Sequence, residues 1–172
     1  MIKRITALFI LCLLLLFPVY SQDSLNVLYQ KLDNSKTESE KAKALIDLSI
    51  YLYRHNQFQK TVKYADSAIK IGKKIENSKY IVTPLSFKSS AYYDLGQREK
   101  AIKAAKESIA VAKNCECPDQ KGRSFINYAD ILNKDTRYDS AIFYYEKALE
   151  ALEEGSINKA NAYNNISIAY AE

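Results

Sequence analysis

The residues best suited to chemistry are two thiols, because only Glu116 separates Cys115 from Cys117. A structural zinc site needs about four ligands, and the chain has one histidine and no second cysteine pair. In an oxidising compartment the two thiols could close a small disulfide or pair between molecules. A plain loop between helices, a disulfide of either kind, and a metal or redox role are the alternatives, of which we favour the plain loop.

No catalytic arrangement accompanies these thiols. The one histidine, His55, falls in a predicted turn, and no acid, base or nucleophile can be named as its partner. The chain has no glycine-rich phosphate loop and neither an HExxH nor a GxSxG motif. We therefore predict a protein that is not an enzyme and that carries neither a cofactor nor a metal.

The charge pattern argues against nucleic acid as a partner. The formal net charge is +5, and there is no block of five like charges and no basic stripe with interleaved aromatic residues. A mild positive excess that is spread along helices is usually a solvated surface.

The N-terminus has the order of segments found in a secretory signal. MIKR carries two positive charges, ITALFILCLLLLF is a run without any charge, and PVYSQ then ends the run. This order predicts a signal peptide over residues 1–21 and hence export to the periplasm or the cell exterior of a bacterium. The alternative is an anchor that stays uncleaved, and the chain would meet a membrane only through this segment.

The rest of the sequence repeats with a period of about 40 residues over three copies. Gly and Pro are scarce, at four and three, and Ala, Lys, Glu, Leu and Ile are plentiful, which favours helices over a turn-rich β fold. Small residues keep the interval at three places, which are Ser49, Ser89 and Ala129, then Thr61, Ala101 and Ala141, and then Ala68, Ser108 and Ala148. A fourth copy follows about 38 residues later with Tyr163, Ile166, Ser167 and Tyr170.

Each copy is expected to fold as two helices joined by a short turn. Thr37 and Glu40 have the spacing of a capping box, and Pro118 suits the first position of a later helix. Pro84 either lies inside a long, bent helix or follows a cap at Thr83, and we favour the long helix because the period argues for equal units. The expected turns are residues 55–57, 95–97 and 134–136. The expected units are residues 37–76, 77–116, 117–155 and a partial unit over 156–172, preceded by a capping helix over 22–36.

The small residues are expected to let the paired helices approach closely. Large side chains such as Leu45, Tyr92 and Phe125 would then fill the space on either side. The pattern resembles that of tetratricopeptide repeats, and the third copy matches it best, at Phe125, Tyr128, Ala129, Leu132, Tyr138, Ala141, Ala148 and Leu149. The first copy departs from it at Thr61, and the second departs at Lys88, Arg98 and Ser108. The copies exceed the usual length of about 34 residues, and such long units are similar to those in exported sensor regions of bacterial membrane-bound regulators.

The resemblance implies an all-α fold, a right-handed α-solenoid of antiparallel helix pairs whose concave face is lined by the first helix of each pair. It places candidate ligand-facing residues along that groove, which are Lys43, Ile50, Tyr53, Ser90, Tyr93, Arg123, Asp130, Asn161 and Asn164. Asn127 and Asn165 neighbour this face, and their amides could hold a peptide backbone. The basic residues that grip a terminal carboxylate in some members of the family are absent.

The function that follows is a non-enzymatic scaffold that binds a protein or peptide segment in the groove, as part of an exported sensing or assembly system. The alternative is a structural adaptor that self-associates, or docks a following domain, through its incomplete repeat over residues 156–172.

Overall fold

The computed structural model describes residues 24–171, and within them every regular element is a helix. A helical segment over 24–33 precedes the helices α2 (Glu38–Arg54), α3 (Phe58–Lys74), α4 (Lys79–Asp94), α5 (Arg98–Lys113), α6 (Pro118–Lys134), α7 (Tyr138–Ala151) and α8 (Ile157–Ala171). The predicted signal peptide lies outside the described residues. Within residues 24–171, no helix is both long enough and apolar enough to span a bilayer.

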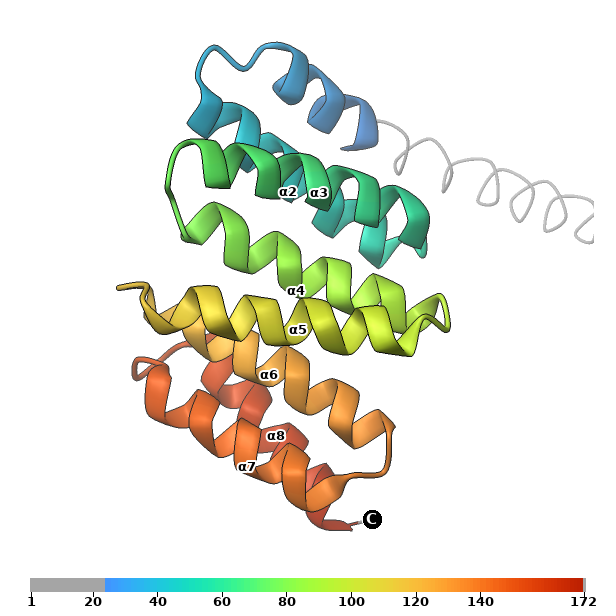
Figure 1. Ribbon diagram of the computed structural model, residues 1–172, viewed down its shortest axis with the longest axis vertical. Helices are drawn as coiled ribbons and strands as arrows, with labels where there is room; N and C mark the ends of the chain where they lie inside the picture. The colour runs from blue at the N-terminus through green and yellow to red at the C-terminus, as the bar shows by residue number, and fades with distance from the viewer. Residues whose placement is uncertain (1–23, 172) are drawn as a thin grey trace, which may run out of the picture.

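The helices stack as antiparallel pairs along one direction, from segment 24–33 at one end to α8 at the other (Figure 1). The first helices of the pairs pack directly on one another, α2 on α4, α4 on α6 and α6 on α8. The second helices are farther apart, and long side chains such as Lys73 of α3 and Glu107 of α5 bridge them. Since the first helices are closer together, they lie on the inner side of the curve. The predicted all-α solenoid of helix pairs is confirmed.

The ends of the helices follow local sequence rules. The Glu40 backbone N–H donates to Thr37 Oγ1 at 3.1 Å, and the Thr37 N–H donates to Glu40 Oε2 at 3.2 Å, so the capping box is confirmed. Pro118 is the first residue of α6, as predicted. Pro84 lies inside α4, so the alternative start at Thr83 is wrong.

Gly72 of α3 lies beside the turn of α4 that precedes the internal proline. Pro84 has no N–H, so the Tyr80 carbonyl cannot accept the helical bond that residue 84 would normally donate. Gly72 of α3 lies against that carbonyl, and a Cβ added to Gly72 would come within 2.9 Å of the Tyr80 oxygen. The absence of a side chain at Gly72 therefore lets α3 and α4 pack closely at this point.

The core confirms the close-packing role of the small residues. The small residues of the three complete copies are fully buried, namely Ser49, Ser89, Ala129, Thr61, Ala101, Ala141, Ala68, Ser108 and Ala148. In the fourth copy the expectation for Ser167 is wrong, because Ser167 is exposed and Ala162 and Ala169 are buried in its place. The difference arises because α8 packs on α6 and α7 alone among the helices that the structure describes, without a following helix over Ser167.

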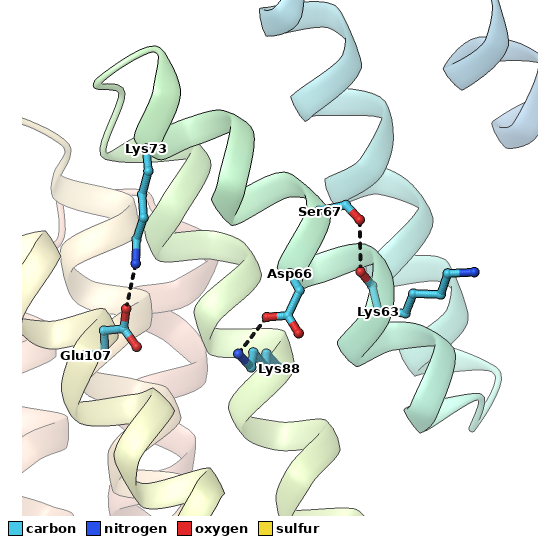
Figure 2. A network of polar contacts seen from close by, with 6 residues as sticks. All are labelled: Lys63, Asp66, Ser67, Lys73, Lys88 and Glu107. Carbon is cyan, nitrogen blue, oxygen red and sulfur yellow. Dashed lines mark hydrogen bonds and ion pairs between the residues drawn. The ribbon is translucent and has the colours of Figure 1, made fainter.

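Two departures of the second copy from the repeat pattern, Lys88 and Ser108, make polar contacts between helices. Lys88 of α4 lies 2.6 Å from Asp66 of α3, in the network shown in Figure 2, where Ser67 Oγ also donates to the Lys63 carbonyl at 3.1 Å. Ser108 of α5 donates to the Val82 carbonyl of α4 at 3.2 Å. These substitutions replace apolar packing by specific bonds between neighbouring helices.

The three turns inside the helix pairs share a residue in the left-handed backbone conformation. Asn56, Gly96 and Thr136 stand one repeat apart in the sequence, and their φ angles are positive, at 58°, 73° and 57°. In each turn the next residue donates its N–H to a carbonyl five residues back, over 2.8–2.9 Å, which closes the end of the preceding helix. Thr136 occupies the left-handed region with a β-branched side chain, which disfavours that conformation.

Exchanging Thr136 and Asn56 tests this strain. We expect Thr136→Asn to raise the free energy of unfolding by about 1 kcal/mol, since asparagine tolerates the left-handed region better than threonine does. The reciprocal Asn56→Thr should lower it by a similar amount, and both positions are exposed, so packing changes little. Urea unfolding followed by circular dichroism measures both, and a Thr136→Asn protein no more stable than wild type would contradict the prediction.

Candidate functional site

Two adjoining pockets lie on the surface formed by the first helices of the pairs. The smaller, of about 200 Å³, lies between α4, α6 and α8, and the larger, of about 300 Å³, extends to Tyr53 of α2 and Tyr145 of α7. Both pockets are lined by Ser90, Asn127 and Asp130. These volumes are at or below the lower end of pockets for drug-sized molecules, so they suit single side chains of a longer segment.

The structure brings most of the predicted groove residues together around these pockets, which are lined by Tyr53, Ser90, Tyr93, Arg123, Asn127, Asp130, Asn161 and Asn165. Three predicted residues lie elsewhere. Lys43 and Asn164 are exposed away from both pockets, and Ile50 packs against the apolar cluster of Leu45 and Ile46. The candidate site is thus concentrated on α4, α6 and α8, with further contributions from Tyr53 of α2 and Tyr145 of α7.

Asp130 is the polar centre of the site. Its Oδ1 accepts a hydrogen bond from the Tyr145 hydroxyl at 2.7 Å and another from Asn165 Nδ2 at 3.1 Å. Burial raises the pKa of the Asp130 carboxyl, and the bonds from Tyr145 and Asn165 oppose that rise because they stabilise the charged form. Burial beside Asp130 also raises the pKa of Tyr145.

Asn127 lies next to Asp130 in both pockets. Its Nδ2 donates to Ser90 Oγ at 2.8 Å, which ties α6 to α4. Its side chain is 7% exposed, and its Oδ1 has no hydrogen-bond partner among the described residues. A buried carbonyl oxygen without a partner is costly, so Asn127 favours a ligand that brings an N–H group.

Arg123 stands at the other end of the smaller pocket. Burial lowers the pKa of its guanidinium, Asp119 opposes this shift, and the positive charge of Arg54 adds to it. No hydrogen bond or ion pair is formed by its side chain within residues 24–171. A half-buried guanidinium in this state attracts an anionic or carbonyl group.

Two tyrosines at the edge of the larger pocket connect neighbouring units. The Tyr53 hydroxyl donates to Asp94 Oδ2 at 2.8 Å, and the Tyr93 hydroxyl donates to Asp135 Oδ1 at 3.3 Å. Burial raises the pKa of Tyr53 to about 12, and the bond to Asp94 adds to the shift. Lys134 Nζ lies 4.9 Å from the centre of the Tyr93 ring, which completes a polar edge.

The groove predicted from the sequence did not include Tyr145 and Phe87, which both line the pockets. A comparison of equivalent positions in the repeats could have identified them. Tyr145 stands one repeat after Ala105 and two repeats after Ala65, so a large side chain replaces two alanines at a buried position. Phe87 stands one repeat before Asn127 and lines the smaller pocket. Both lie at positions that the family pattern does not mark as ligand-facing, which is why the resemblance did not reveal them.

The two thiols lie away from both pockets. Cys115 and Cys117 are joined by a disulfide at the junction of α5 and α6, with their Cα atoms 5.2 Å apart, which differs from the favoured plain loop. The ring of His55 packs on that of Tyr51, with centroids 4.2 Å apart. Between residues 24 and 171, no group of three or more His, Cys, Asp or Glu side chains has an arrangement that could hold a metal ion.

Comparison with known proteins assigns a family to part of the chain. A family model described as "Tetratricopeptide repeat" matches residues 80–154. These residues carry tetratricopeptide repeats. Repeats of this family generally form non-enzymatic scaffolds for interactions between proteins, which agrees with the pockets on the inner helices.

Two known proteins are similar to this chain, one in sequence and one in fold. The "Outer dynein arm-docking complex subunit 4" of Danio rerio is 29% identical over 87 residues, which cover 51% of this chain and 18% of that protein. The crystal structure of BtubC (BKLC) from P. vanneervenii matches with a TM-score of 0.65 and 15% identity, over 85% of this chain and 62% of that one. At this identity the likeness concerns the fold alone. The tetratricopeptide array thus spans less than two thirds of either relative.

Removal of the Tyr145 hydroxyl tests the electrostatics of Asp130. We expect Tyr145→Phe to raise the pKa of Asp130 further, because it deletes a donor that stabilises the carboxylate. The titration of the aspartate carboxyl carbons by NMR measures the shift. An Asp130 pKa that is the same in wild type and Tyr145→Phe would contradict it.

The same carboxyl predicts a pH dependence of stability. Its pKa is higher in the folded state than in the unfolded chain, so the folded state binds the proton more tightly. Relative to Asp130→Asn, the free energy of unfolding should therefore fall as the pH rises from about 4 through the raised pKa, and then level off. Asp139→Asn makes the same change at an exposed position outside both pockets and is the matched control for the substitution.

Proposed function

We propose that this protein binds an extended segment of a partner protein along the inner surface of the array. The observation that carries the proposal is the pair of adjoining pockets that share Ser90, Asn127 and Asp130. Three successive inner helices line them with amide, hydroxyl, carboxylate and guanidinium groups, which can both donate to and accept from a peptide backbone. The "docking-complex" name of the Danio rerio relative is consistent with a scaffold role.

We further propose that the scaffold works outside the cytoplasm, in an exported sensing or assembly system. The support is the charged, apolar and polar order of residues 1–21 in the sequence. A disulfide between Cys115 and Cys117 suits an oxidising compartment. Fractionation of cells that express the protein, with an N-terminal sequence of the product, distinguishes a cleaved and exported chain from one that stays in the cytoplasm.

Selection of peptides against the purified protein tests the binding function. A phage-displayed library of random dodecamers should yield peptides that bind the wild type. Asn127→Ala and Tyr53→Ala should then weaken the selected peptides about tenfold each, which corresponds to about 1.4 kcal/mol. Fluorescence anisotropy with a labelled peptide measures this effect.

Asn164→Ala is the matched control, because Asn164 is exposed on α8 and lines neither pocket. It should leave the affinity unchanged. Thermal unfolding of each variant verifies that the array is intact. If the substitutions in the pockets do not alter the affinity for a selected peptide, the assignment of the groove is wrong.

A second candidate function is assembly through α8. This helix exposes four large apolar side chains, Ile157, Tyr163, Ile168 and Tyr170, and the last is 71% exposed. Ile168 also lines the larger pocket. Tyr163 and Tyr170 correspond to Phe125 and Leu132 of the preceding copy, where Phe125 packs on Tyr144 of α7 and Leu132 is buried. We propose as the alternative that a second copy of the chain, or a domain that follows it, covers this surface.

Sedimentation velocity separates the two candidates. If α8 mediates self-association, the wild type should sediment as a dimer at micromolar concentration, and the double variant Tyr163→Ser, Tyr170→Ser should sediment as a monomer. Phe143→Ser on α7 is a control for the loss of one exposed ring. A wild type that remains monomeric rules out self-association through α8.

A further inference from the structure

Two opposite charges face the smaller pocket from the same helix. Arg123 and Asp130 are seven residues apart on α6, so they lie on the same side of the helix about 10.5 Å apart along its axis. Both line the pocket of about 200 Å³, together with Phe87 of α4 and Asn161 of α8. The two residues are too far apart along the helix for a close ion pair with each other.

Neither charge forms a close ion pair within residues 24–171, and the opposite charges that act on them from farther away, Lys134 on Asp130 and Asp119 on Arg123, are bonded elsewhere. The bonds to Asp130 come from the neutral donors Tyr145 and Asn165, and Lys134, one turn along, is paired with Asp94 at 3.4 Å. The Arg123 side chain forms no hydrogen bond among the described residues. Oδ1 of the nearby Asp119 accepts a hydrogen bond from the Ser156 hydroxyl at 2.7 Å. Charges that are partly removed from water without a partner destabilise a fold, and an opposite charge from outside would relieve this cost.

Asn127 lies between the two charges on the same face of α6. Its buried Oδ1 has no partner among the described residues and needs an N–H donor. A peptide that lies across the pocket offers a backbone N–H at each residue. The order of groups along α6 is therefore a cation, a hydrogen-bond acceptor and an anion.

We propose that this pocket is a dual-charge site for an extended peptide, in which an acidic side chain meets Arg123 and a basic side chain meets Asp130. An extended chain advances about 3.3–3.5 Å per residue, so about 10.5 Å corresponds to three residues, and side chains two residues apart point to the same face of the chain. The two charged side chains should therefore stand two or three residues apart. The inference rests on the proposed function and specifies the class of segment that the groove takes.

An array of short peptides tests the proposal. Fluorescein-labelled octapeptides on an Ala/Ser background carry one Glu and one Lys at separations of one to six, in both orders, beside versions with one charge or none. The full protein should bind the peptides with separations of two or three at least tenfold more tightly than the versions with one charge. Anisotropy at two salt concentrations should show weaker binding at the higher one.

Two substitutions test which residue of the protein binds which charged side chain of the peptide. Arg123→Gln should make the protein indifferent to the Glu of the peptide, and Asp130→Asn should make it indifferent to the Lys. Asparagine keeps an oxygen that can accept from Tyr145 and Asn165, so Asp130→Asn preserves the local bonds. Lys43→Gln, which changes an exposed charge outside both pockets, should leave all affinities unchanged.

The outcomes separate this inference from the proposed function. If random dodecamers bind in the groove but charge and spacing in the octapeptides have no effect, the dual-charge site is overturned and peptide binding stands. Binding that depends on charge but is unchanged by both Arg123→Gln and Asp130→Asn also overturns it. If neither the dodecamers nor the octapeptides bind, the proposed function fails, and the dual-charge site fails with it.

Discussion

Close contact between helices at small side chains is the constraint on which the rest of this structure depends. Ala68, Ser89 and Ala129 have no exposed surface, and each stands where a larger side chain would separate two helices. Because these contacts recur once in every repeat, each pair of helices is placed on the last in nearly the same way. The inner helices are thereby held side by side, and their polar residues come together into pockets.

Much of the fold could be predicted from the sequence, since periodicity and capping are local signals. The capping box at Thr37, the proline at the start of α6 and the turn residues Asn56 and Gly96 all follow from rules that operate within a few residues. The expectation for Ser167 failed because burial there depends on a covering helix and not on the repeat pattern.

The site was less predictable, for a physical reason. A family pattern marks which positions face the groove, and it found Arg123 and Asp130, with Asn127 beside them. It cannot show that Tyr145 reaches Asp130 from the second helix of the pair, or that Asn127 keeps an oxygen without a partner. Such properties depend on the depth of each side chain and on its neighbours across helices, which the spacing of one sequence does not encode.

The different spacing of the inner and outer helices has a mechanical consequence. The inner helices pack directly on one another, whereas α3 and α5 are connected on the outside by Lys73 and Glu107, both exposed to solvent. Dense apolar packing resists stretching, and exposed ion pairs yield to it and weaken as ions screen them. The outer helices should therefore move apart or together more easily than the inner ones. The curvature of the array should decrease as the ionic strength rises.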